Sequence, residues 1–178
     1  HCLMKAQGGA GLLLGGVPGV APARVVVLGG GGAGSHATRM ALGAGAEVTV
    51  VDRSLPRLRQ LASEFGSSLK TEYSTRDTVE RLVQSADVVV GSVLIRGEAA
   101  PRLVTRDMVA GMHAGAVLVD IAIDQGGCFE TSKPTSHDAP TYVEHGVVHY
   151  CVTNMPGAVP RTSTAALTHA TLPYIRSL

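Results

Sequence analysis

Short apolar runs rich in valine alternate along the chain with longer stretches in which apolar residues recur at helical spacing. Runs of the first kind predict strands of a parallel sheet, since strands buried on both faces read as nearly continuous apolar segments. Stretches of the second kind predict amphipathic helices. The strands are expected at residues 24–28, 47–51, 69–73, 87–93, 115–123 and 147–152.

The segments between these strands predict helices, and Ser54 is a candidate N-cap for one of them. Alternating strands and helices imply right-handed crossovers and a doubly wound parallel sheet, so the expected fold class is α/β. Residues 125–140 are polar and are expected to form a loop. The helices are expected at residues 35–44, 55–65, 75–85, 105–112 and 162–175, the last interrupted at Pro173.

The chain is expected to have three parts. Glycine and proline crowd residues 8–22, so this stretch reads as a connecting segment. The sequence begins at His1 without an initiator methionine, and we expect residues 1–22 to be a hinge from a missing N-terminal domain. Residues 23–160 are expected to form the main domain, and residues 161–178 a C-terminal helix.

A glycine cluster, Gly29-x-Gly31-x-x-Gly34, lies between the first predicted strand and the first predicted helix. In such a unit the first glycine permits a tight turn, the second lets the backbone approach a pyrophosphate, and the third lets helix and strand pack closely. The helix N-terminus adds unpaired N–H groups and the positive end of a dipole. The arrangement predicts a Rossmann-type dinucleotide-binding domain.

Asp52 follows the second predicted strand, at roughly the 20-residue spacing expected for the acid that binds the adenosine ribose. The alternative is a strand-terminal Asp that caps the next helix. As a ribose ligand, Asp52 favours NAD over NADP, because a carboxylate repels a 2′-phosphate. Arg53 counts against this selectivity, since a nearby Arg can accommodate that phosphate.

Composition argues against several other partners. Hydrophobic residues make up 45% and charged residues 16%, as in ordinary folded proteins. A net charge of +1 without a run of like charges does not favour nucleic acid or an acidic membrane surface, and the apolar runs are far shorter than a membrane span. The cysteines, Cys2, Cys128 and Cys151, do not read as a disulfide framework, so a cytoplasmic location is expected.

Other chemistries have weaker support. His145, His149 and Cys151 share one parity along a strand and, together with Cys128, could form a zinc site. Buried cysteine and histidine in a strand are the commoner arrangement, so no metal is expected. Ser35 and Ser92 do not lie in a Gly-x-Ser-x-Gly elbow, and hydrolase chemistry is therefore not supported.

The most specific signal is a set of long motifs: LLLGGVPGV, VVVLGGGGAG, VDIAIDQGGCFETSKPTSHD and NMPGAVPRTST. Together they resemble the alanine dehydrogenase family, from about residue 7 to the C-terminus. The resemblance implies a homohexamer of two-domain subunits that interconverts L-alanine with pyruvate and ammonia in amino-acid catabolism, with NAD as the hydride carrier. The C-terminal helix would return to the N-terminal substrate domain.

The resemblance also implies which residues bind the adenosine half of the cofactor. The glycines Gly29, Gly31 and Gly34 form the turn, and Gly32 and Ala33 approach the pyrophosphate. The adenosine ribose and adenine would be held by Asp52, Arg57 and Ser74, and the centre of the cofactor would be contacted by Val93 and Leu94.

The nicotinamide end would lie farther along the same edge of the sheet. Lys133 stands where the family often has Arg, and because a point charge replaces a bidentate fork its cofactor contact is left open. The resemblance places around the nicotinamide the residues Ile121, Ala122, Ile123, Asp124, Val152, Thr153, Asn154 and Met155.

Asp124 is the candidate catalytic residue of this chain. By the resemblance it faces the substrate, where a carboxylate could stabilise a cationic amine or iminium and relay protons. The alternative is that Asp124 organises the following turn through its own side chain.

The family's substrate-binding Arg and Lys and its catalytic His belong to the N-terminal domain, and no segment of this chain matches it. The chain alone is therefore expected to be inactive. Two alternatives remain: a nucleotide-binding module without catalysis, and the NAD(H)-binding part of the related proton-translocating transhydrogenase, which shares the glycine unit.

Overall fold

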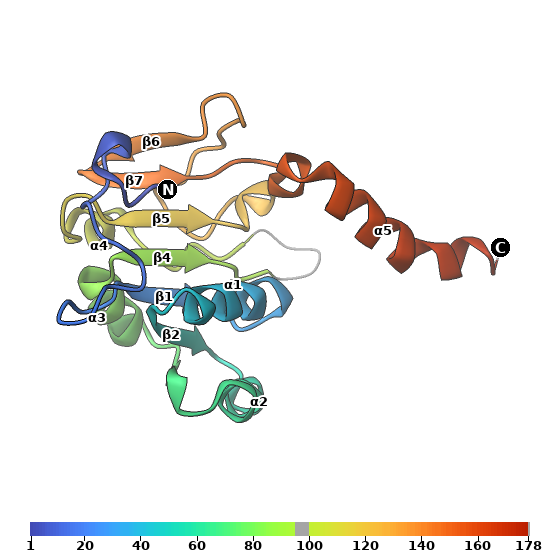
Figure 1. The fold of residues 1–178 in the computed structure, drawn as a ribbon, viewed down its shortest axis with the longest axis horizontal. Coiled ribbons are helices and arrows are strands. Elements are labelled where there is room, and N and C mark those ends of the chain that lie inside the picture. The colour runs from blue at the N-terminus through green and yellow to red at the C-terminus, as the bar shows by residue number, and fades with distance from the viewer. Residues whose placement is uncertain (95–99, 178) are drawn as a thin grey trace.

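The computed structural model describes residues 1–94 and 100–177 and contains a seven-stranded sheet of order β3-β2-β1-β4-β5-β7-β6 (Figure 1). Every neighbouring pair is parallel except β6 and β7, so the predicted doubly wound α/β fold is confirmed. The strands are β1 (Arg24–Leu28), β2 (Glu47–Asp52), β3 (Leu69–Tyr73), β4 (Val88–Gly91), β5 (Val117–Asp120), β6 (Thr141–Glu144) and β7 (Val147–Tyr150).

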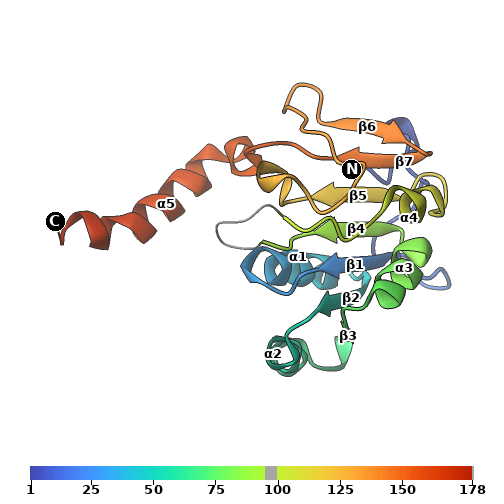
Figure 2. The same cartoon turned by 180° about the vertical axis from the view of Figure 1, so that it is seen from behind.

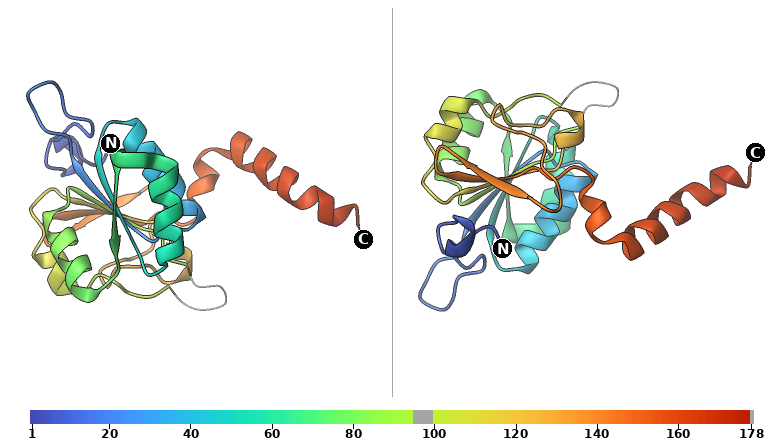
Figure 3. Two further views of the ribbon diagram at one scale, coloured as in Figure 1. Left: turned by 90° about the horizontal axis from the view of Figure 1, so that it is seen from below. Right: turned by 90° about the horizontal axis from the view of Figure 1, so that it is seen from above.

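Helices cover both faces of the sheet (Figure 3). Val25 and Val27 of β1 belong to the apolar core shared with α1 and α2, whereas Val26 and Leu28 belong to the core shared with α3 and α4. This alternation follows from the two-residue repeat of a strand, and it explains why the run had to be apolar throughout. The helices are α1 (Gly32–Gly43), α2 (Leu55–Phe65), α3 (Arg76–Ser85), α4 (Arg106–Ala110) and α5 (Pro160–Ile175).

The N-terminal segment, residues 1–22, packs against the sheet. Leu3 is buried in a cluster with Val117 and Val148, at the starts of β5 and β7. The N–H of Ala10 donates to the carbonyl of Gly115 at 2.9 Å. These contacts lie where the parallel strands begin, at the opposite edge from the strand ends that carry the predicted site.

Three strands are shorter than predicted, because the chain turns soon after the last paired residue, and the run 147–152 forms a strand only over Val147–Tyr150. The run 87–93 forms a strand only over Val88–Gly91, and the run 115–123 only over Val117–Asp120. A 3-10 turn, Ile123–Gln125, takes up the end of the second run. Apolar character alone did not mark these ends, since Val93 and the residues 121–123 beyond them are still apolar.

The antiparallel edge was missed. Residues His145 and Gly146 join β6 to β7 with φ of 53° and 75°, as in a type I′ hairpin turn. The usual sequence signals for that turn are Asn-Gly and Asp-Gly, and here His145 takes the left-handed position. The hairpin was therefore not predicted, although the loop before it was.

The C-terminal helix α5 projects away from the sheet (Figures 1 and 2), and none of its residues is buried. It runs through Pro173, so the predicted interruption is wrong. Pro173 lies in the last turn of the helix, where its missing N–H removes only one hydrogen bond.

In the described part of the chain, no helix is long and apolar enough to cross a membrane.

Candidate functional site

The glycine cluster forms the turn from β1 into α1. Gly29 has a φ of 95°, in the left-handed region that favours glycine. A β-carbon on Gly34 would lie 1.8 Å from the carbonyl oxygen of Gly29, so the helix packs directly on the turn. Because α1 starts at Gly32, three residues before the predicted start at residue 35, Gly32 and Gly34 lie in its first turn and Gly31 is its N-cap.

Gly31 and Gly32 face open space. A β-carbon at either position would meet nothing within 4 Å. The N–H groups in the first turn of α1 have no partners within the helix, and the dipole of the helix favours an anion beside them. The turn can therefore hold a phosphate group against its backbone.

Asp52 ends β2 beside this turn and is half-buried. Its Oδ2 accepts the N–H of Gly30 at 2.7 Å, and its Oδ1 accepts the N–H of Ser54 at 2.8 Å. Each carboxylate oxygen keeps a lone pair for a further donor. Asp52 can thus organise the turn and still accept a hydrogen bond from a ligand hydroxyl.

Arg57 lies behind the glycine turn. Its Nε donates to the carbonyl of Gly30 at 2.6 Å, and its Nη2 donates to Ser35 Oγ at 2.5 Å. The guanidinium is therefore engaged with the turn itself. The sequence pointed to Arg57 as a ribose ligand, and the structure adds this supporting role.

Ser92 is a site residue that the sequence did not indicate. Its hydroxyl lies 2.9 Å from the carbonyl oxygens of both Leu28 and Gly29, and the side chain is buried. It ties the end of β4 to the glycine turn. No local pattern could mark this serine, because its partners lie 64 and 63 residues earlier in the chain.

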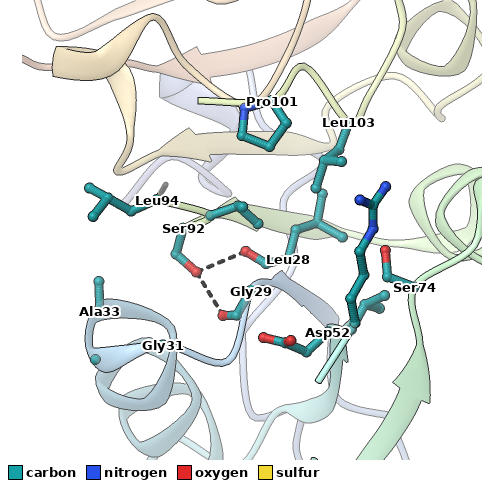
Figure 4. Close-up of a pocket in the computed structure, with 14 residues that line it drawn as sticks. Leu28, Gly29, Gly31, Ala33, Asp52, Ser74, Ser92, Leu94, Pro101 and Leu103 are labelled. Carbon is teal, nitrogen blue, oxygen red and sulfur yellow. Dashed lines mark hydrogen bonds between the residues drawn. The ribbon is translucent and has the colours of Figure 1, made fainter. Parts of the chain in front are cut away.

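These groups line one pocket of about 500 Å³ at the ends of β1, β2 and β4 (Figure 4). The pocket brings together eight of the predicted cofactor-binding residues: Gly29, Gly31, Gly32, Ala33, Asp52, Ser74, Val93 and Leu94. The rest of its described lining is Leu28, Val51, Arg53, Ser92, Pro101 and Leu103.

The residues predicted around the nicotinamide lie outside this lining, at the ends of other strands. The segment 121–124 follows β5, and the segment 152–155 follows β7. The N–H of Ile121 donates to the carbonyl of Gly91 at 2.8 Å, which holds the first segment beside the end of β4. Both segments share the edge at which parallel α/β sheets bind their ligands.

Asp124 is exposed and makes no side-chain hydrogen bond to a residue that the structure describes. The turn after β5 is organised instead by Asp120, which no sequence motif had singled out. Its Oδ1 accepts the N–H of Ala122 at 3.1 Å, and its Oδ2 accepts the N–H of Cys128 at 2.8 Å. The described hydrogen bonds therefore assign the organisation of this turn to Asp120 and give the side chain of Asp124 no part in it.

Lys133 forms an ion pair with Glu144. Its Nζ donates to Glu144 Oε2 at 2.7 Å and lies 5.5 Å from the centre of the Tyr142 ring. The hydrogen bond from Lys133 is the main reason that the pKa of Glu144 is lowered. Lys133 does not belong to the described lining of the pocket.

The residues considered for zinc are used in other ways. His149 is buried and stacks on Tyr142, with ring centres 4.8 Å apart. Its Nδ1 donates to the carbonyl of Val147 at 3.0 Å, and its Nε2 lies 2.7 Å from Thr131 Oγ1. Burial lowers the pKa of His149, which favours a neutral ring that accepts the Thr131 proton. Within residues 1–94 and 100–177, no three His, Cys, Asp or Glu side chains gather as a metal site.

Cys128, next to the predicted nicotinamide segment, is fully buried. Burial, together with the nearby carboxylate of Asp120, raises the pKa of its thiol to about 12. The thiolate is the reactive form of cysteine, so this thiol is unsuited to nucleophilic chemistry.

Comparison with known proteins gives matches over the whole chain. The profile of the family described as "Alanine dehydrogenase/PNT, C-terminal domain" matches residues 1–178. An alanine dehydrogenase of Halomonas elongata is 64% identical over 178 residues, which are 100% of this chain and 48% of that protein. An alanine dehydrogenase of Mycolicibacterium smegmatis is 58% identical over 176 residues, 99% of this chain and 47% of the relative.

Solved structures also match most of the chain. An L-alanine dehydrogenase structure superposes with a TM-score of 0.95 at 52% identity, covering 98% of this chain and 48% of the other. A transhydrogenase from Sinorhizobium meliloti superposes with a TM-score of 0.78 at 27% identity, covering 89% of this chain and 45% of the other. The chain spans about half the length of the curated relatives it matches.

Proposed function

This chain belongs to the family of alanine dehydrogenase and PNT C-terminal domains, and from that premise we propose that it is the NAD(H)-binding half of an alanine dehydrogenase. The pocket at the ends of β1, β2 and β4 is the observation that carries the proposal. It combines an open glycine turn, a helix N-terminus and an acid at the neighbouring strand end, which are the groups that a dinucleotide requires.

The adenosine half of NAD fits the residues that line this pocket. Gly31, Gly32 and Ala33 would bind the pyrophosphate through backbone N–H groups, since nothing blocks the approach to the two glycines. Asp52 would accept hydrogen bonds from the ribose, with Ser74 near the adenine. Arg57 would act from behind by holding the turn, and Val93 and Leu94 would contact the centre of the cofactor.

The nicotinamide, which would accept or return a hydride, belongs beside the segments 121–124 and 152–155. The exposed carboxylate of Asp124 would stabilise the cationic amine or iminium of the substrate and help to move a proton. We propose that L-alanine, or pyruvate and ammonia, reaches this edge from an N-terminal domain that supplies the substrate-binding Arg and Lys and the catalytic His.

We extend the proposal to assembly and location. Helix α5 has no buried residue, and Leu167, Tyr174 and Ile175 are each more than half exposed, which supports a return to the substrate domain. The family resemblance supports a homohexamer and a role in amino-acid catabolism. The three cysteines are free, which agrees with a cytoplasmic location.

A transhydrogenase subunit is the weaker alternative. The glycine turn and the fold fit both functions. The TM-score and the sequence identity are both higher with the alanine dehydrogenase structure than with the transhydrogenase structure. A non-catalytic nucleotide-binding module would keep the pocket and lack a substrate domain.

Two assays test the proposal. We expect the 178-residue chain to bind NADH in a fluorescence titration and to show no alanine-dependent NAD reduction. The same chain extended by the N-terminal half of its protein should reduce NAD when L-alanine is added. Activity in the bare chain, or an extended protein that exchanges hydride between nucleotides and ignores alanine, would contradict it.

A further inference from the structure

The turn after β5 is built around a buried carboxylate. Asp120 is the last residue of β5 and is fully buried. Its carboxylate accepts three hydrogen bonds, from the N–H groups of Ala122 and Cys128 and from the hydroxyl of Ser132. No cationic side chain of the described residues forms an ion pair with it.

A carboxylate is the group that suits this set of partners. Each of the three partners donates, and an ionised carboxylate only accepts. An amide in the same place would point its own N–H groups at one or two donors. Burial raises the pKa of Asp120 and the donated hydrogen bonds oppose that shift, so the hydrogen bonds replace the missing counter-ion.

The surrounding backbone is shaped to admit this carboxylate. Gly127 has a φ of 81°, and a β-carbon there would lie 2.7 Å from Asp120 Oδ2. The bonds to Ala122 and Cys128 close the two ends of the intervening loop onto one side chain. Asp124 lies at the exposed middle of that loop.

Ser132 extends the same network to the other predicted nicotinamide segment. Its Oγ lies 3.9 Å from the thiol of Cys151, the residue just before the segment 152–155. The carboxylate of Asp120 thus binds Ala122 in the first segment and lies, through Ser132, close to Cys151, which precedes the second. The loop also reaches the adenosine pocket at one end, because the N–H of Leu103 donates to the carbonyl of Cys128 at 2.9 Å and the Cys128 thiol donates to the carbonyl of Val93 at 3.7 Å.

We propose that Asp120 is a positioning residue, which fixes the loop 121–128 so that the side chain of Asp124 stays free at the nicotinamide end of the site. This inference rests on the proposed NAD(H)-binding function. It gives two neighbouring acids different roles, since Asp120 holds the loop from inside and Asp124 faces the reaction from outside.

The test compares two ligands that share the adenosine half. NADH carries the nicotinamide, and ADP-ribose lacks it. In the 178-residue chain, we expect Asp120→Asn to weaken NADH binding by about tenfold and ADP-ribose binding by no more than about threefold, by calorimetric titration, because only the Cys128 end of the loop reaches the adenosine pocket. Ser132→Ala, which removes one donor and disturbs the fold less, should shift the same ratio by about threefold.

The matched control is Asp87→Asn. Asp87 is also a buried carboxylate that accepts a backbone N–H, that of Arg24 at 2.7 Å, but it lies before β4 at the opposite edge of the sheet. Its loss should lower stability without changing the ratio of the two dissociation constants.

The outcomes separate the two levels of the proposal. Equal loss of both ligands, or of neither, in Asp120→Asn would overturn the positioning role while the proposed function stands. If Asp120→Asn does not fold, an unchanged ratio in Ser132→Ala overturns it instead. A wild-type chain that binds neither NADH nor ADP-ribose would overturn the proposed function and this inference with it.

Discussion

The two halves of the proposed cofactor site are built differently. In the adenosine half, the side chains of Asp52, Arg57 and Ser92 all bind the backbone of the glycine turn, and together the elements enclose a pocket. In the nicotinamide half, Asp120 holds the loop from beneath while Asp124 stays exposed. Under the proposed function, this chain would complete the first half by itself and would present the second half to a substrate domain.

The largest expected effect comes from breaking the adenosine half at its closest contact. Gly34→Ala places a methyl group where it would meet the Gly29 carbonyl at 1.8 Å, so α1 must move away from β1. We expect a loss of about 3 kcal/mol of stability by urea unfolding, together with weaker NADH binding. Gly43→Ala in the same helix meets nothing within 4 Å and is the control. Equal stability of the two variants would contradict the close packing.

The next expected effect is a loss of catalysis without a loss of stability, at Asp124 in the nicotinamide half. Because Asp124 is exposed and makes no side-chain hydrogen bond to a described residue, Asp124→Asn should leave the melting temperature and the Kd of NADH nearly unchanged. In the extended two-domain protein we expect kcat to fall by at least about a hundredfold, the scale of a lost acid–base or electrostatic contribution. Asp138→Asn, in another exposed loop, is the control. An active variant that melts early would assign Asp124 a structural role.

A smaller effect concerns the choice of cofactor. The carboxylate of Asp52 lines the pocket and should repel a 2′-phosphate, so we expect NADH to bind about tenfold more tightly than NADPH. Asp52→Asn should narrow that ratio, although both affinities fall because the turn loses an acceptor. Glu47→Gln, at the other end of β2, should leave the ratio unchanged. Equal binding of NADH and NADPH by the wild type would remove Asp52 from this role.

The smallest expected effect is on the pH dependence of stability, through His149 on β7, the strand that precedes the segment 152–155. Burial lowers the pKa of His149 in the folded state, so below about pH 6.5 the unfolded chain binds a proton more readily than the folded chain. Stability should therefore fall as the pH drops from about 7 to about 5, and His149→Gln should flatten this dependence in urea unfolding curves. His36→Gln, on α1 away from this cluster, should retain the wild-type slope. An unchanged slope in His149→Gln would show that His149 is not the group responsible.

The sequence by itself determined the parallel sheet, the glycine turn and the place of Asp52. These features depend on local residues: each strand of the sheet shows its own short apolar run, and the glycine turn and Asp52 lie at fixed spacing within one βαβ unit. The same locality explains why the ends of β1 and β3 were predicted correctly.

Only the tertiary structure decided the parts whose partners are distant or non-repetitive. Ser92 acts on a turn 63 residues away, and Asp120 depends on Ser132 and on a glycine that leaves room for its carboxylate. From the sequence, Asp120 and Asp124 were two similar acids at the end of one strand. The folded loop encloses Asp120 and leaves Asp124 exposed, so one is a buried acceptor and the other a free carboxylate. A carboxylate loses its water only after that loop has closed, and its sequence position alone does not determine this.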